Sequence, residues 1–195
     1  MQKVFNSRIG KDAMSAAVLD SINHIFRSIK KTGDGALAQL SFEEMQRVPG
    51  GGSEINSIAV IIHHLHGNMK SRWSDFLTSD GEKPWRDRDG EFDPPPDKNR
   101  EELMARWNHG WATVFNALDA LKPDDLARTV TIRGQPHTVL EAAHRQISHY
   151  AYHIGQIVLL AKMFKSSGPW QTLSIARGQS KQYRPRGLGG EARNK

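Results

Sequence analysis

Hydrophobic residues recur every three or four positions over four long stretches of this chain, which is the spacing of amphipathic helices. Gly33 and Gly35 are expected to end the first helix, and Ser53 is expected to cap the start of the second. The four predicted helices cover residues 7–31, 53–77, 98–121 and 138–165. Helices of about 24 residues are about 36 Å long and can pack side by side. We therefore predict an all-α fold, a four-helix bundle.

The connections between these helices are long. Residues 37–47 are compatible with a short extra helix, and the sequence Pro49–Gly52 is expected to interrupt helical structure before the second long helix. Residues 78–97 form a loop of the length that usually carries function, and its Trp85 and Phe92 predict that it packs against the bundle. Thr129–Ile132 and His137–Val139 predict a small hairpin before the last helix. Such connections argue against the simplest up-and-down bundle.

Histidine is abundant, with nine residues in the chain, and two groups stand out. His149 and His153 are four positions apart on a predicted helix, so both imidazoles lie on one face and can bind one metal ion side by side. The alternative is two polar residues on a partly exposed face, or a core histidine with a hydrogen-bond partner. His63, His64 and His66 interrupt an apolar run, where a polar group is costly unless it has a partner. Their spacing does not select one of the three.

Composition narrows the possible chemistry. The chain has no cysteine, which excludes disulfides, thiolate metal sites and a cysteine nucleophile. A metal must therefore use histidine, carboxylate or water. The low mean hydropathy and short apolar runs exclude a membrane span, and the first twenty residues lack the apolar stretch of a secretory signal. We expect a cytoplasmic protein.

The net charge is +6, and its distribution disfavours nucleic-acid binding. Residues 166–195 carry +5 of this charge, so the remaining body is almost neutral, whereas a nucleic-acid-binding body should show clustered basic residues. We expect one domain over residues 1–183 and a basic, disordered tail over residues 184–195.

Several motifs occur in an order that resembles the DinB/YfiT-like superfamily of four-helix metal-binding proteins, and more narrowly an uncharacterised DinB-like branch of it. The motifs are Asn56-Ser57-Ile58-Ala59, His64-Leu65-x-Gly67-Asn68-Met69, Ser71-Arg72-Trp73-x-Asp75-Phe76-Leu77, Asp80 to Arg86, Arg106-Trp107, Gly110-Trp111, His149-x-x-x-His153-x-Gly155-Gln156-Ile157 and Leu173-Ser174-Ile175. The resemblance extends to about Tyr183.

The resemblance implies a metal site made by His64, His149 and His153. Three imidazoles leave open positions on a divalent ion, as in catalytic sites, and imidazole suits zinc and nickel. Members of the superfamily include thiol S-transferases and an isomerase. The resemblance thus implies a metal-dependent S-transferase or isomerase acting on a low-molecular-weight thiol, and a homodimer. The alternative is a non-enzymatic, metal-stabilised binding or stress-response module.

Other residues could support such a site. Asn68 and Gln156 are candidates for orienting the ligands, with interhelical hydrogen bonding as the alternative. Four residues, Arg72, Trp73, Trp85 and Arg86, could line a pocket mouth and hold an anionic substrate. The alternative for the two tryptophans is an aromatic core beneath the long loop.

Overall fold

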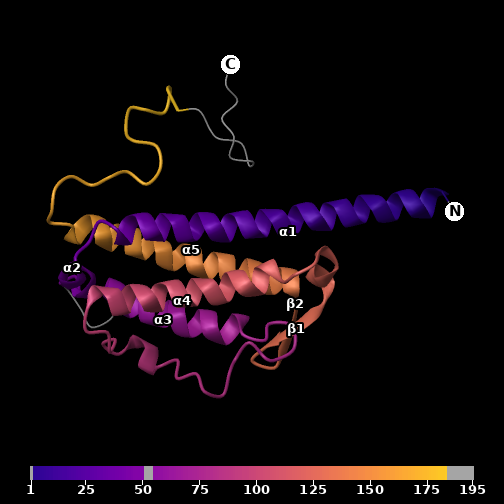
Figure 1. Ribbon diagram of the computed structural model, residues 1–195, viewed down its shortest axis with the longest axis horizontal. Coiled ribbons are helices and arrows are strands. Elements are labelled where there is room, and N and C mark those ends of the chain that lie inside the picture. Colours follow the sequence, from indigo (N-terminus) through magenta and orange to yellow (C-terminus); the bar gives the residue numbers. More distant parts are fainter. Residues whose placement is uncertain (1, 51–54, 184–195) are drawn as a thin grey trace.

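Four long helices pack side by side in the computed structural model, which describes residues 2–50 and 55–183, with side chains from residue 12 onward (Figure 1). They are α1 (Gln2–Leu37), α3 (Ile58–Trp73), α4 (Arg100–Asp119) and α5 (Val139–Phe164). The most extensive helix–helix contacts join α3 to α4 and α1 to α5. The predicted all-α class and helical bundle are confirmed.

Both ends of the first two long helices differ from the predicted ranges, since α1 spans Gln2–Leu37 and α3 spans Ile58–Trp73. The first helix continues through Gly33 and Gly35, where neighbouring side chains approach its backbone closely: a Cβ on Gly33 would lie 2.8 Å from the ring of Trp107, and one on Gly35 would lie 2.7 Å from Leu173. The second long helix begins at Ile58, where the Ser57 hydroxyl accepts a hydrogen bond from the backbone N–H of Val60. Ser53, the predicted cap, lies outside the described residues.

Short elements occupy the two ends of the bundle. Helix α2 (Phe42–Gln46) is fixed by a capping box and corresponds to the short helix that residues 37–47 allowed. The predicted hairpin is present as β1 (Thr129–Ile132) and β2 (Gln135–Thr138), paired antiparallel. Two short 3₁₀ helices, η1 (Gly90–Phe92) and η2 (Pro123–Ala127), complete the fold.

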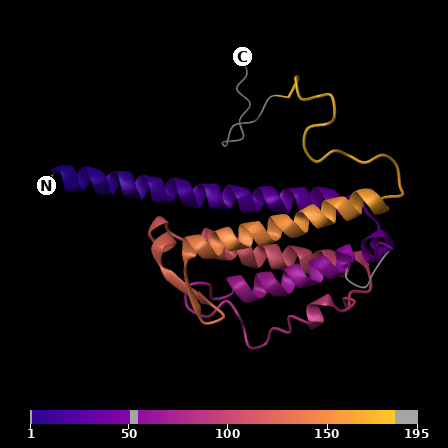
Figure 2. The same cartoon turned by 180° about the vertical axis from the view of Figure 1, so that it is seen from behind.

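The chain direction explains the long connection between α3 and α4. Both helices run the same way along the bundle, while α1 and α5 run the opposite way (Figures 1 and 2). Residues 74–99 must therefore return along the outside of α3 before α4 can start, and η1 contacts α3 on this return path. This return segment, residues 74–99, places side chains next to α3 that do not come from the other three long helices.

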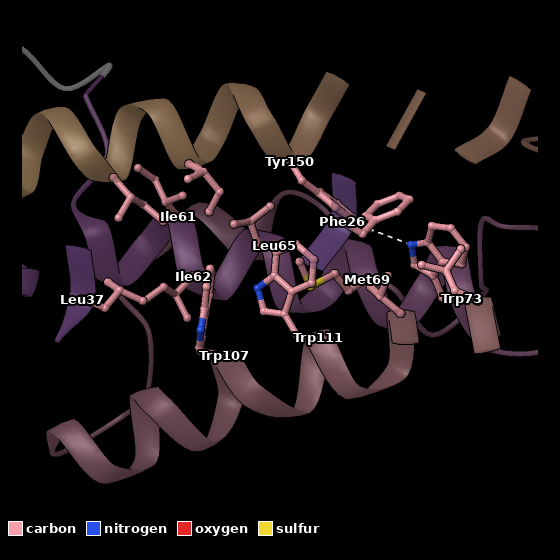
Figure 3. Close-up of a cluster of buried hydrophobic side chains, with 14 of the residues drawn as sticks. Phe26, Leu37, Ile61, Ile62, Leu65, Met69, Trp73, Trp107, Trp111 and Tyr150 are labelled. Carbon is pink, nitrogen blue, oxygen red and sulfur yellow. Dashed lines mark hydrogen bonds between the residues drawn. The ribbon is translucent and has the colours of Figure 1, made fainter. Parts of the chain in front are cut away.

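Aromatic side chains fill the centre of the core (Figure 3). The rings of Trp107 and Trp111 are buried between α4 and α3, and Phe26 of α1 packs edge-on against Trp73 and Tyr150. The indole N–H of Trp73 donates to the hydroxyl of Tyr150 at 2.9 Å, which gives these buried polar groups a partner.

Two remaining predictions concern a membrane span and the basic C-terminal tail. None of the described helices combines the length and the apolar character needed to cross a bilayer. The expected basic tail, residues 184–195, lies outside the described residues.

Candidate metal centre

Three histidines from two helices meet beside the return segment. His149 and His153 are one turn apart on α5, and His64 projects from α3 toward them. The Nε2 atom of His149 lies 3.3 Å from Nε2 of His64 and 3.1 Å from Nε2 of His153. These three nitrogens lie within 4.8 Å of one another, so the cluster could hold a metal ion. The structure thus brings together the three ligands that the resemblance implied.

The Nδ1 atoms of His64 and His153 make hydrogen bonds that leave the Nε2 lone pair of each ring facing the cluster. His64 Nδ1–H donates to a carboxylate oxygen of Glu91 at 2.9 Å, and His153 Nδ1–H donates to Gln156 Oε1 at 2.8 Å. The amide nitrogen of Gln156 donates to the Tyr152 hydroxyl, which leaves its oxygen facing His153. Gln156 therefore orients a candidate ligand, as the sequence suggested.

The resulting donor set fits a divalent cation. The Nε2 lone pairs of His64 and His153 both face Nε2 of His149, which can donate a proton to only one of them. A divalent ion accepts all three nitrogens at once, which is the ligand number of catalytic zinc sites. The imidazoles therefore fit the metal that the resemblance implied.

Low pKa values keep two of the three imidazoles in the neutral form. Burial, assisted by the neighbouring His153 and His64, lowers the pKa of His149 to about 3. Burial and His64 lower the pKa of His153 to about 4. Both rings are neutral at physiological pH, so they can donate lone pairs without first losing a proton.

A buried ion pair supports His64 and was not found from the sequence. Glu91 of η1 accepts hydrogen bonds from Arg86 Nε at 2.7 Å and from the Arg86 NH2 group at 2.9 Å. Burial would raise the pKa of Glu91, but the hydrogen bonds from Arg86 and His64 outweigh it, and the pKa is lowered. The carboxylate therefore stays ionised behind His64, an arrangement that raises the basicity of a metal-binding imidazole.

Gly67 makes room for this carboxylate. A Cβ at position 67 would overlap the side chain of Glu91, so the glycine of the His64-Leu65-x-Gly67-Asn68 motif lets η1 approach α3. Phe92, next to Glu91, stacks on the His64 ring with the ring centroids 4.7 Å apart. The return segment therefore packs against the candidate ligand, as its length and aromatic residues indicated.

The other two histidines of α3 point elsewhere. His66 Nε2 lies 3.0 Å from His109 Nδ1 on α4, and burial lowers the pKa of His66 to about 4. His63 is half-buried and belongs to neither group. Of the three, His64 is the one that faces α5, which spacing alone could not establish.

Three further candidates hold the helices together or lie on the surface, and of these only Asn68 also lines the cavity described below. The hydroxyl of Tyr150 donates to Asn68 Oδ1 at 3.1 Å, so Asn68 forms an interhelical hydrogen bond. Trp73 belongs to the aromatic core, which was the alternative reading of that residue. Trp85 is 55% exposed with its ring 5.1 Å from Lys70 Nζ, so the prediction that it packs down beneath the loop is wrong.

An open cavity of about 700 Å³ borders the histidine cluster. All three histidines line it, together with Arg72 and Arg86, the two arginines predicted at a pocket mouth. Trp73 and Trp85 are absent from its wall, because one is in the core and the other faces outward. The cavity is large enough for a small molecule to reach the three nitrogens.

Fold and site together define a helical-bundle protein with a three-histidine cluster that is accessible to small molecules. The chain belongs to DUF1572, a family described as a protein of unknown function, whose model matches residues 13–179. A solved structure of a conserved protein from Enterococcus faecalis is similar, with a TM-score of 0.51 and 16% identity over 78% of this chain and 96% of that chain. This likeness concerns the fold alone. The comparison with curated proteins found no match.

Proposed function

We propose that His64, His149 and His153 bind one divalent ion, zinc or nickel, and that the protein uses it in a transfer or isomerisation reaction that involves a low-molecular-weight thiol. The observation that carries this proposal is the convergence of three Nε2 atoms at the wall of an open cavity of about 700 Å³. The resemblance of the motifs to the DinB/YfiT-like superfamily supports the thiol chemistry.

The residues around the cluster have separate tasks in this proposal. When bound, the ion supplies positive charge that lowers the pKa of an incoming thiol. Glu91 and Gln156 hold His64 and His153 in one tautomer and one orientation. Because the chain has no cysteine, no thiol of the protein competes with the substrate for the cluster.

Elemental analysis of protein purified without an affinity tag tests the metal site. We expect about one zinc or nickel per chain in the wild type, and loss of the metal in His64→Ala and His153→Ala. His66→Ala is the matched control, since it removes a neighbouring imidazole that faces α4, and it should keep the metal. A wild-type protein that binds neither metal after incubation with both would overturn the proposal.

A second measurement separates an enzyme from a binding module. The metal-loaded protein is assayed for conjugation of several small thiols to several electrophiles, with His149→Ala as the inactive control. Thiol conjugation by the wild type alone supports the enzyme. A protein that holds its metal but conjugates no thiol would instead be the metal-stabilised module. Light scattering on the same sample tests the homodimer implied by the resemblance.

A further inference from the structure

Five arginines from four parts of the chain line the cavity beside the histidine cluster. They are Arg72 of α3, Arg86 and Arg88 of the return segment, Arg133 of the β1–β2 turn and Arg145 of α5. Among the described residues that form the cavity wall there is no aspartate or glutamate. The wall is therefore strongly positive before any metal ion is added.

Carboxylates behind the wall neutralise only part of this charge. Glu82 accepts from the Arg72 NH2 group and from Arg133 Nε, each at 2.9 Å, and Glu91 is paired with Arg86. Five guanidinium groups thus face two inner carboxylates. Asp89, 3.6 Å from Arg88, has a side chain that is 97% exposed and offsets little charge in water.

Arg145 lacks an internal partner. Its side chain makes no hydrogen bond, ion pair or ring contact with the described part of the chain, although it lines the cavity from α5. A long cationic side chain without a partner extends into solvent, so the charge of Arg145 is free to meet a ligand in the cavity.

Two deeply buried polar atoms at the wall have no partner in the described residues. Gln146 is 3% exposed and its Oε1 accepts no hydrogen bond, and Arg72 is 6% exposed and its Nε donates none. Both residues line the cavity. Both atoms are closed off from the cavity by their neighbours, so the charge that a ligand meets there comes from Arg88, Arg133 and Arg145.

The turn that carries Arg133 departs from the usual sequence preference. Arg133 has a φ of 54° and Gly134 a φ of 70°, the conformation of a tight hairpin turn that favours asparagine or glycine at the first position. An arginine costs about 1 kcal/mol more there than glycine. Its guanidinium pairs with Glu82 and the residue lines the cavity, so the turn brings a positive charge to the wall.

We propose that the small molecule bound next to the histidine cluster is a dianion, a thiol that carries two carboxylates, held by Arg88, Arg133 and Arg145. Guanidinium groups match carboxylates in geometry and form strong charge-assisted hydrogen bonds with them. This inference rests on the proposed function for the thiol, whereas the charge preference stands on the arginines alone.

Calorimetric titration of the zinc-loaded full chain with three probes tests both parts. Mercaptosuccinate carries a thiol and two carboxylates, 2-mercaptoethanol carries only the thiol, and succinate carries only the carboxylates. We expect mercaptosuccinate to bind at least about tenfold more tightly than either of the others, and high salt to weaken it. Arg145→Gln should weaken mercaptosuccinate by about tenfold without affecting folding, because Arg145 has no internal partner. Arg177→Gln, the same charge change outside the cavity, should have no effect.

The outcomes separate the two proposals. Equal affinity for mercaptosuccinate and 2-mercaptoethanol would overturn the dianion and leave the thiol function intact. Equal affinity for succinate and mercaptosuccinate, with the Arg145→Gln effect present, would support the anion site and overturn the thiol. If none of the probes binds to protein that holds one zinc per chain, the dianion inference is overturned. Equal losses in Arg145→Gln and Arg177→Gln would assign the effect to net charge and would also overturn it.

Discussion

Replacing Glu91 by glutamine tests whether the buried ion pair behind His64 sets the metal affinity. The side chains of Glu91 and Arg86 are 6% and 2% exposed, and Glu91 also accepts the Nδ1–H of His64. Glutamine has the same shape, but it removes the charge and turns one acceptor atom into a donor that faces the Arg86 guanidinium. The change therefore weakens both the ion pair and the support of His64.

The structure sets the size of both effects. Removing one partner of a buried ion pair costs about 3–5 kcal/mol of folding free energy. Glu82, 3.9 Å from Arg86, and the remaining amide oxygen of glutamine reduce this loss to about 2–3 kcal/mol. Loss of an outer carboxylate behind a ligating histidine lowers metal affinity by about 10–100-fold. We expect effects of this size in Glu91→Gln.

Two assays measure these effects separately. Zinc affinity is obtained by competition with a chromophoric chelator at pH 7.5, and the stability of the metal-free protein by urea unfolding. Asp89→Asn is the matched control: its carboxylate is 97% exposed, so the change should alter stability by less than about 0.5 kcal/mol and leave zinc affinity unchanged. Gly67→Ala should reproduce the Glu91→Gln defect from the other side, by pushing the carboxylate away from His64. A folded Glu91→Gln protein whose zinc affinity equals that of the wild type would refute the reasoning.

Two further predictions concern helix packing and pH. Gly33→Ala should lower the free energy of unfolding by about 1–3 kcal/mol despite the better helix propensity of alanine, because its Cβ would press on the ring of Trp107. Gly155→Ala, in open space on α5, should raise the same free energy by up to about 1 kcal/mol, and urea unfolding that ranks the two variants in the opposite order would contradict the packing. Burial would raise the pKa of Asp80, but backbone N–H groups, including that of Gly134, outweigh it and lower the pKa to about 2. This carboxylate therefore stabilises the fold above about pH 4, and the stabilisation is lost as the pH falls toward 2. The difference in urea midpoint between wild type and Asp80→Asn should close over that range. A difference that stays constant would show that the charge of Asp80 is not responsible.

Periodicity predicted the existence of the four long helices, but it could not place their ends. Gly33 is a helix breaker in isolation, and it is tolerated inside α1 because the close contact with Trp107 favours the smallest residue there. The start of α3 was placed too early, although Ser57 is as good a cap as Ser53. Both errors arise because tertiary contacts and a nearby equivalent residue decide the boundary.

Only part of the candidate site could likewise be predicted from the sequence. The pair His149 and His153 follows from helix geometry, and the resemblance selected His64 from three neighbouring histidines. Glu91 lies 27 residues from His64, in a loop without periodicity, so nothing in the spacing connected the two. The arginines at the cavity wall come from separate segments and meet only after the chain has folded.

The distance along the chain between the clustered histidines determines when the site can form. His64 and His149 are 85 residues apart, and neither faces the other until α3, the return segment and α5 have all docked. Helices form within microseconds, whereas contacts between distant residues appear late in folding. A chain whose last helix has not docked lacks the three-histidine cluster, so metal binding by all three nitrogens requires the completed bundle.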